Sequence, residues 1–304
     1  MLRSPDFVII GAAKSASTWL HLALRQHPAV YMPASETPFF EDPYYNASDL
    51  GPLLAELKAA PPGAVVGIKC PNYLCTPQCA PRLARHLPQA RLVAILRNPV
   101  DRAISQYYHL IRSGQLPVVP ADTAFAHYLA GHFDPPYARQ LVLDFGRYAM
   151  GVENFRRAFP SEQLLILTDL DMRRSSLEVF KRVCGFLGVE QTSVPMGVSV
   201  PRNQGVYFAP FLRFIQFMNH HGQTYDPASG LVQLRPGLLG WGARRLALFA
   251  SRLSAATRIF VRTQEPAVSQ QTRAALLAFY LPDIVELERM TNIDLAPWKV
   301  LQRA

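Results

Sequence analysis

The chain has 304 residues, enough for one large α/β domain or two small ones with an ample core. Its residues are 49% hydrophobic and 17% charged, which is typical of a globular protein. The formal net charge of +9 fits a polyanionic partner: nucleic acid, an anionic membrane surface, or an anionic cofactor or acceptor. Because no run of like charges forms a basic tail, we favour a pocket.

The sequence gives no sign of a membrane span or a metal site. No stretch of about 18 uncharged apolar residues occurs, so we expect no membrane-spanning helix. The first predicted strand starts by Asp6, so we expect no secretory signal. The four cysteines lack the C-x-x-C spacing of a metal site, and Cys75 and Cys79 are interpreted as two thiols near a helix start. We therefore expect a reducing, cytoplasmic location and no metal.

The chain opens with a strand, a short loop and a helix. Residues 7–10 are an apolar, β-branched run typical of a buried parallel strand, and residues 11–13 form a small-residue turn. Lys14 and several hydroxyl residues follow, before a helical pattern that continues to Gln26. This order points a helix N-terminus and backbone N–H groups at one spot, where a phosphate or sulfate binds. The alternative is an ordinary turn with a solvated lysine.

The loop resembles a Walker A motif but departs from it in detail. A pattern of that kind starting at Gly11 needs glycine at position 16 and lysine at position 17, where this chain has Ala16 and Ser17. The lysine comes early, at position 14.

Strands and helices then alternate along the chain. This alternation indicates a right-handed, doubly wound parallel sheet, whose ligands bind beyond the carboxyl ends of the strands. Lys14, Lys69 and Arg97 each follow a predicted strand, so we expect all three at one edge of the sheet. The predicted elements are strands at 29–32, 64–68, 91–96 and 163–168, and helices at 50–60, 77–87, 100–113, 121–129, 139–159 and 170–187, the last capped by Gly188.

The loop at 35–45 is dense in aromatic and acidic residues. Aromatic rings beside carboxylates are typical of an acceptor pocket, and packing of the loop onto the core is the alternative.

The C-terminal third differs in character. Residues 206–265 are rich in Phe and Leu with Gly and Pro interruptions, and residues 244–262 combine helical apolar spacing with arginines. A basic amphipathic helix of this kind contacts an anionic membrane or packs on its own domain. A final helix is predicted at 269–290. We interpret residues 1–304 as a single domain with a helical insertion at 206–265.

Residues 91–109, RLVAILRNPVDRAISQYYH, resemble the 3′-phosphate-binding motif of the sulfotransferase superfamily. In that motif a strand ends in Arg-(Asp/Asn)-Pro, and a serine follows eight residues after the arginine. These positions are Arg97, Asn98, Pro99 and Ser105 here. The opening GAAKSAST resembles the family's 5′-phosphosulfate loop, with Lys14 as its lysine.

Further matches follow in the family's order, covering roughly residues 6–205 and 272–298. They are similar to the branch that contains heparan-sulfate and bacterial glycan enzymes. The matching segments are 35–40 (Glu-x-x-Phe-Phe), 69–73 (Lys-x-Pro-x-Tyr), 146–148 (Gly-x-Tyr), 164–188 and 202–205. The chain departs from the pattern where Pro38 replaces a frequent histidine, where Ala16 and Ser17 replace glycines, and throughout 206–265, which carries no family motif.

The resemblance implies a three-layer α/β/α fold like that of P-loop NTPases. It also implies transfer of a sulfuryl group from 3′-phosphoadenosine 5′-phosphosulfate (PAPS), leaving 3′,5′-bisphosphate (PAP), without a metal. Glu36 is the implied general base, Lys14 stabilises the leaving phosphate, and Lys69 steadies the sulfuryl oxygens or the acceptor. The implied nucleotide-binding residues are Lys14, Ser15, Ala16, Ser17, Thr18, Trp19, Arg97, Ser105, Tyr148, Arg202 and Gly205. Tyr148 either contacts adenine or fills the core.

Two rival functions are a P-loop kinase or NTPase and a non-catalytic relative. A kinase or NTPase would need a GK[ST] loop and a carboxylate that binds Mg²⁺. The sequence lacks that loop pattern, and neither the strand before Lys69 nor the strand before Arg97 ends in an aspartate. Retention of Lys14, Glu36 and Arg97 argues against a non-catalytic relative. The expected acceptor is a hydroxyl or amine of a glycan, glycolipid or small molecule, and no nucleic-acid partner is expected.

Overall fold

The computed structural model describes residues 4–133, 135–191, 209–225, 232–235, 237, 241–243, 245–246 and 266–301. The chain divides into two compact units, each assembled from separate stretches of sequence. The first unit contains Met1–Asn98, Arg147–Pro201 and Asp283–Leu295, and the second contains Pro99–Gly146, Arg202–Pro282 and Ala296–Ala304.

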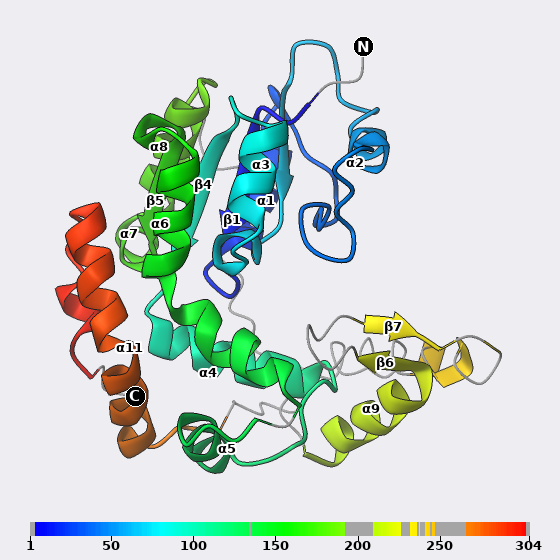
Figure 1. Cartoon of the computed structure of the whole chain (residues 1–304), viewed down its shortest axis with the longest axis vertical. Helices are drawn as coiled ribbons and strands as arrows, with labels where there is room; N and C mark the ends of the chain where they lie inside the picture. Colours follow the sequence, from blue (N-terminus) through cyan, green and yellow to red (C-terminus); the bar gives the residue numbers. More distant parts are fainter. Residues whose placement is uncertain are drawn as a thin grey trace. The chain divides into compact units, whose positions relative to one another are not determined.

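The first unit is built around a parallel sheet, as the alternating sequence pattern predicted (Figure 1). In the described part of the chain its five strands lie in the order β2-β3-β1-β4-β5, and every pair is parallel. Helices flank this sheet, which confirms the α/β class. The strands are β1 (Phe7–Gly11), β2 (Val30–Tyr31), β3 (Val65–Lys69), β4 (Arg91–Leu96) and β5 (Leu164–Thr168).

One face of the sheet packs against two helices. Phe7 and Ile9 of β1 join Trp19 of α1 (Ser17–Arg25) and Phe180 of α8 (Ser176–Leu187) in one buried apolar cluster. Full burial of these side chains fixes α1, and therefore its N-terminus, relative to the strand ends. The unit also contains α2 (Gly51–Glu56), η1 (Tyr73–Cys75), α3 (Cys79–His86), α6 (Tyr148–Ala158), η4 (Ser161–Gln163) and α7 (Asp169–Arg174).

Gly67 is required at the centre of the sheet. It lies opposite Phe7 in the β1–β3 register, and a Cβ at this position meets the Phe7 ring at 2.1 Å. We expect Gly67→Ala to lower the free energy of unfolding by about 1–3 kcal/mol, because the ring must leave its packed position. Urea unfolding measures this loss.

Gly185→Ala is the matched control, because its Cβ meets only the Nε2 end of the exposed Gln191 side chain, at 3.0 Å. In helix α8 this exchange is expected to be neutral or stabilising by up to about 1 kcal/mol. Equal stability of the Gly67→Ala variant and the natural protein would contradict the packing argument.

The prediction of one helix over 170–187 is wrong, because Ser175 divides it. Its backbone is extended (φ −163°, ψ 110°), and its side chain accepts a hydrogen bond from the Glu178 N–H at 3.2 Å. Ser175 thus ends α7 and caps α8. The predicted cap at Gly188 is confirmed by its left-handed conformation (φ 73°).

The single helix predicted over 139–159 is also wrong. Residues Arg139–Leu143 form a π-helical turn (η2), Asp144–Gly146 a 3₁₀ turn (η3), and α6 begins only at Tyr148. Side chains from elsewhere donate to the carbonyls that a continuous helix would use. The donors are Arg102, which bonds Leu141 at 3.1 Å and Val142, and Tyr280, which bonds Leu143 at 2.9 Å.

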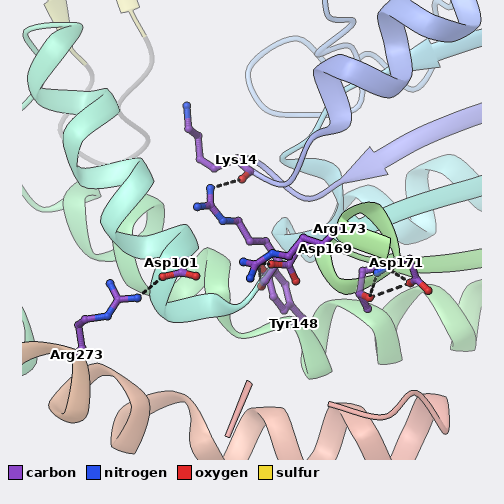
Figure 2. A network of polar contacts seen from close by, with 9 residues as sticks. Lys14, Asp101, Tyr148, Asp169, Asp171, Arg173 and Arg273 are labelled. Carbon is purple, nitrogen blue, oxygen red and sulfur yellow. Dashed lines mark hydrogen bonds and ion pairs between the residues drawn. The ribbon is translucent and has the colours of Figure 1, made fainter. Parts of the chain in front are cut away.

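The second unit is mostly helical in its described residues. Its helix α4 begins at Pro99, after the two residues that follow β4, and the Asp101 side chain on it pairs with Arg273 of α11 (Figure 2). Helix α4 ends at Arg112, and α11 (Gln270–Thr291) contributes to both units. The other described elements of this unit are α5 (Ala121–Leu129), η2, η3, α9 (Ala209–Gly222), the antiparallel strands β6 (Gln223–Tyr225) and β7 (Val232–Leu234), and η5 (Ala296–Trp298).

Candidate active site

The loop between β1 and α1 has the backbone of an anion-binding site. Lys14 and Ala16 both adopt the left-handed conformation, with φ of 67° and 66°. Ala16 is the N-cap of α1, and no side chain caps that helix end. The first N–H groups of a helix lack intrahelical partners and attract anions, and a loop that mixes left- and right-handed residues turns its N–H groups inward.

Arg97 ties this loop to the end of β4. Its Nη1 donates to the carbonyl of Lys14 at 3.2 Å, and its own carbonyl accepts from the Tyr148 hydroxyl at 3.0 Å (Figure 2). A guanidinium has five N–H donors, so the bond to Lys14 leaves capacity for a phosphate. The predicted meeting of the Lys14 loop and Arg97 is thus present within the first unit.

Lys69 and Glu36 form a second group beside the N-terminus of α1. Lys69 Nζ lies 2.8 Å from Glu36 Oε1 and 3.1 Å from Thr18 Oγ1. The Lys69 side chain is only 2% exposed, whereas that of Glu36 is 51% exposed. A buried ammonium group therefore orients a carboxylate that solvent reaches.

The loop that carries Glu36 is held by packing and by backbone hydrogen bonds. The N–H of Thr37 donates to the carbonyl of Lys69 at 2.8 Å, and the Tyr73 hydroxyl donates to the carbonyl of Thr37. Arg82 donates to the Phe40 carbonyl and to Asp42, both at 2.9 Å. Glu36 therefore stands on an anchored segment although it lies in no helix or strand.

Glu41 lies in the same loop and was not among the predicted site residues. Burial, and secondarily the charge of Glu36, raises its pKa to about 7, whereas hydrogen bonds with Cys70 and Asn72 act in the opposite direction. Burial also raises the pKa of Cys70 and Cys79, so both thiols stay protonated at neutral pH. The sequence signal for Glu41 was its place among aromatic residues, but nothing local indicates its burial.

This raised pKa predicts a pH-dependent stability. The folded state of Glu41 holds its proton more tightly than the unfolded state, whose pKa is the ordinary 4.5. The stability that this proton binding contributes is complete below pH 4.5 and is lost as the pH rises through about 7. We expect the natural protein to lose about 2–3 kcal/mol relative to Glu41→Gln between pH 5 and 8. Urea unfolding of both proteins across this range measures the difference, and parallel stability curves would refute it.

The other predicted nucleotide-binding residues lie in different surroundings. Ser15 and Ser17 are 2% and 4% exposed, and Trp19 is part of the apolar core. Tyr148 is 1% exposed, and its hydroxyl bonds the Arg97 backbone. Ser105 is partly buried on α4 of the second unit. Arg202 and Gly205 lie outside the described residues, as does most of the basic stretch 244–262.

The described part of the chain has neither a metal-binding cluster nor a helix suited to a membrane. Within the described ranges, no group of three or more His, Cys, Asp or Glu side chains is arranged to hold a metal ion. None of the described helices combines the length and apolarity needed to cross a bilayer.

Comparison with known proteins assigns the class of this site. The family model described as "Sulfotransferase domain" matches residues 4–198, and the chain belongs to the sulfotransferase family. It is an α/β sulfotransferase, as its fold and motifs predicted.

Two mouse enzymes illustrate the relationship more closely. The bifunctional heparan sulfate N-deacetylase/N-sulfotransferase 4 of Mus musculus is 30% identical over 200 residues, covering 61% of this chain and 22% of that enzyme. Heparan sulfate glucosamine 3-O-sulfotransferase 3A1 of the same species is 28% identical over 193 residues, covering 62% and 46%. The chain thus matches less than half the length of either relative.

A solved sulfotransferase from Alicyclobacillus acidocaldarius shares the fold. It superposes with a TM-score of 0.66 at 22% identity, covering 98% of this chain and 100% of that one.

Proposed function

We propose that this sulfotransferase moves a sulfuryl group from PAPS to a hydroxyl or amine of a carbohydrate. The observation that carries the proposal is that Arg97 bonds the backbone of the Lys14 loop and Lys69 bonds Thr18 in the first turn of α1, so that three basic residues lie at or after the carboxyl ends of neighbouring parallel strands beside one helix N-terminus. Three cations and a helix end beyond parallel strands suit a ligand with several anionic groups.

The donor's two ends need different groups. The loop at residues 12–16, with Lys14 and the start of α1, suits the 5′-phosphosulfate, and Arg97 suits the 3′-phosphate. Ser105 and Arg202 are further candidates for the 3′-phosphate, and the Gly205 amide is a candidate contact, on the strength of the family resemblance. Tyr148 is the candidate contact for adenine, and its buried ring favours a packing role.

The chemistry requires the acceptor to lose a proton and the leaving phosphate to gain charge. Glu36 takes the proton as the acceptor atom bonds sulfur and the bond from sulfur to the 5′-phosphate oxygen breaks. Lys14 and the α1 N-terminus stabilise the negative charge that develops on that phosphate. Lys69, whose Nζ is 2.8 Å from Glu36 Oε1, holds that carboxylate in place and is the candidate for steadying the sulfuryl oxygens or the acceptor.

A carbohydrate acceptor is supported by the relatives, whose names give heparan sulfate as their substrate. The net charge of +9 also suits an anionic polymer or cofactor. Attack by oxygen and attack by nitrogen both fit Glu36 as base, so the proposal includes both.

Nucleotide titration followed by a transfer assay tests the proposal. Calorimetry should give tight binding of PAP and weak binding of ATP–Mg²⁺, and ³⁵S-labelled PAPS should label chemically desulfated heparan sulfate. The reverse nucleotide preference would favour a kinase or NTPase. PAP binding without transfer to any carbohydrate or small-molecule acceptor would favour a non-catalytic relative.

A further inference from the structure

Asp283 caps a helix that lies far from it in sequence. Its Oδ1 and Oδ2 accept hydrogen bonds from the Ala149 N–H at 3.2 and 3.3 Å, and the Tyr148 N–H also bonds this carboxylate. Arg147, the N-cap residue of α6, makes no side-chain cap. Asp283, on the part of α11 that belongs to the first unit, therefore does what an N-cap side chain normally does.

The surroundings of the Asp283 carboxyl suit a capping role. Burial raises the pKa of Asp283 to about 6, and the nearby Glu286 also raises it, whereas the two N–H bonds and the charge of Arg147 lower it. A desolvated carboxylate is costly, and the N-terminus of a helix is one of the places that offsets the cost.

The helix that Asp283 caps leads directly to the nucleotide site. Tyr148, the first residue of α6, donates from its hydroxyl to the Arg97 carbonyl at 3.0 Å. Arg97 in turn donates to the Lys14 carbonyl at 3.2 Å. A series of hydrogen bonds thus links Asp283 through Tyr148 and Arg97 to Lys14 in the loop between β1 and α1, here called the anion loop. All four residues belong to the first unit, and Figure 2 labels Lys14 and Tyr148.

We propose that Asp283 is a positioning residue for nucleotide binding, which fixes the start of α6 and thereby places Tyr148, Arg97 and the Lys14 loop. The inference rests on the proposed use of PAPS. It adds a residue that acts through the start of α6 and comes from a part of the chain far in sequence from Lys14.

The test measures PAP affinity by calorimetry in the 304-residue chain, with thermal unfolding recorded in parallel. Asp283→Ala is expected to weaken PAP binding about fivefold, because α6 loses its cap and the Arg97 carbonyl its fixed partner. Asp283→Asn keeps one acceptor oxygen and should stay within about twofold of the natural protein. Glu286→Ala is the matched control on the same helix, since that side chain is exposed and pairs with Arg289; it should leave affinity unchanged.

A double-mutant cycle separates positioning from general stability. Tyr148→Phe removes the hydroxyl that reaches Arg97, and adding Asp283→Ala to it should weaken binding less than the two separate effects predict. A lower melting temperature with unchanged PAP affinity in Asp283→Ala overturns the proposal. If that variant does not fold, unchanged affinity in Tyr148→Phe overturns it instead. Failure of the natural protein to bind PAP contradicts the proposed function. In that case the melting temperature of Asp283→Ala still tests whether Asp283 caps α6.

Discussion

Replacing Glu36 with glutamine is expected to lower kcat about 10²–10⁴-fold, the usual contribution of a positioned general base. The amide keeps the size of the side chain and a carbonyl oxygen for Lys69 Nζ, which lies 2.8 Å from Oε1 in the natural protein. It does not take a proton from the acceptor. PAP affinity should therefore stay within about twofold, because the substitution leaves the anion-binding donors in place. Initial rates at saturating PAPS and acceptor measure the effect.

Glu56→Gln is the control for this variant. Glu56 accepts a hydrogen bond from Thr37 Oγ1 at 2.8 Å, so it touches the residue next to Glu36. Its exchange should leave kcat within about twofold of the natural enzyme, since no proton transfer depends on it. Unchanged turnover in Glu36→Gln would show that another group accepts the proton, and the assignment of the base would be withdrawn.

The residues at the carboxyl edge of the sheet were predictable because the end of each strand can be recognised from the local sequence. β3 ends at Lys69 and β4 is followed by Arg97, and parallel strands bring such positions to one edge whatever the rest of the chain does. The pairing of Lys69 with Glu36 needed more than this. It depends on Thr37 bonding the Lys69 backbone and on Tyr73 holding Thr37, contacts between segments more than 30 residues apart.

Side chains that act from a distance were not predictable. Glu41 and Asp283 look like ordinary acidic residues in the sequence, and it is mainly burial in the folded chain that raises their pKa values. The helix breaks at Ser175 and Gly146 were missed for related reasons. Ser175 is a local cap signal, but the apolar spacing on both sides of it also fits one continuous helix. The break before Tyr148 arises where Arg102 and Tyr280 donate hydrogen bonds to backbone carbonyls of residues 141–143.

The loop between β1 and α1 keeps left-handed backbone conformations although its sequence departs from the family pattern. Ala16 and Ser17 replace the usual glycines, yet Lys14 and Ala16 both adopt positive φ. A non-glycine residue in this conformation costs about 1–2 kcal/mol, so the surrounding contacts must hold the loop. One of them is the Arg97 guanidinium on the Lys14 carbonyl, at 3.2 Å. Under the proposed function Arg97 thus has two tasks, binding the 3′-phosphate and keeping the loop between β1 and α1 in shape.

This double task makes Arg97 the residue with the largest expected effect on nucleotide affinity. Arg97→Ala should weaken PAP binding about 30–100-fold, since hydrogen bonds to charged groups contribute about 2–3 kcal/mol and the loop also loses a contact. Arg97→Lys keeps the charge but loses the forked donor geometry, so its affinity should fall between the two. Calorimetric titration with PAP measures all three proteins.

Arg91→Ala provides the control, because Arg91 begins the same strand, is exposed, and lies at the opposite edge of the sheet from Arg97. It removes the same positive charge from the chain, so a purely long-range effect of net charge should weaken PAP binding equally in both variants. We expect Arg91→Ala to bind within about twofold of the natural protein at 0.15 M salt, where charges more than about 8 Å apart are screened. Equal losses in the two variants, or none in Arg97→Ala, would mean that the 3′-phosphate binds elsewhere.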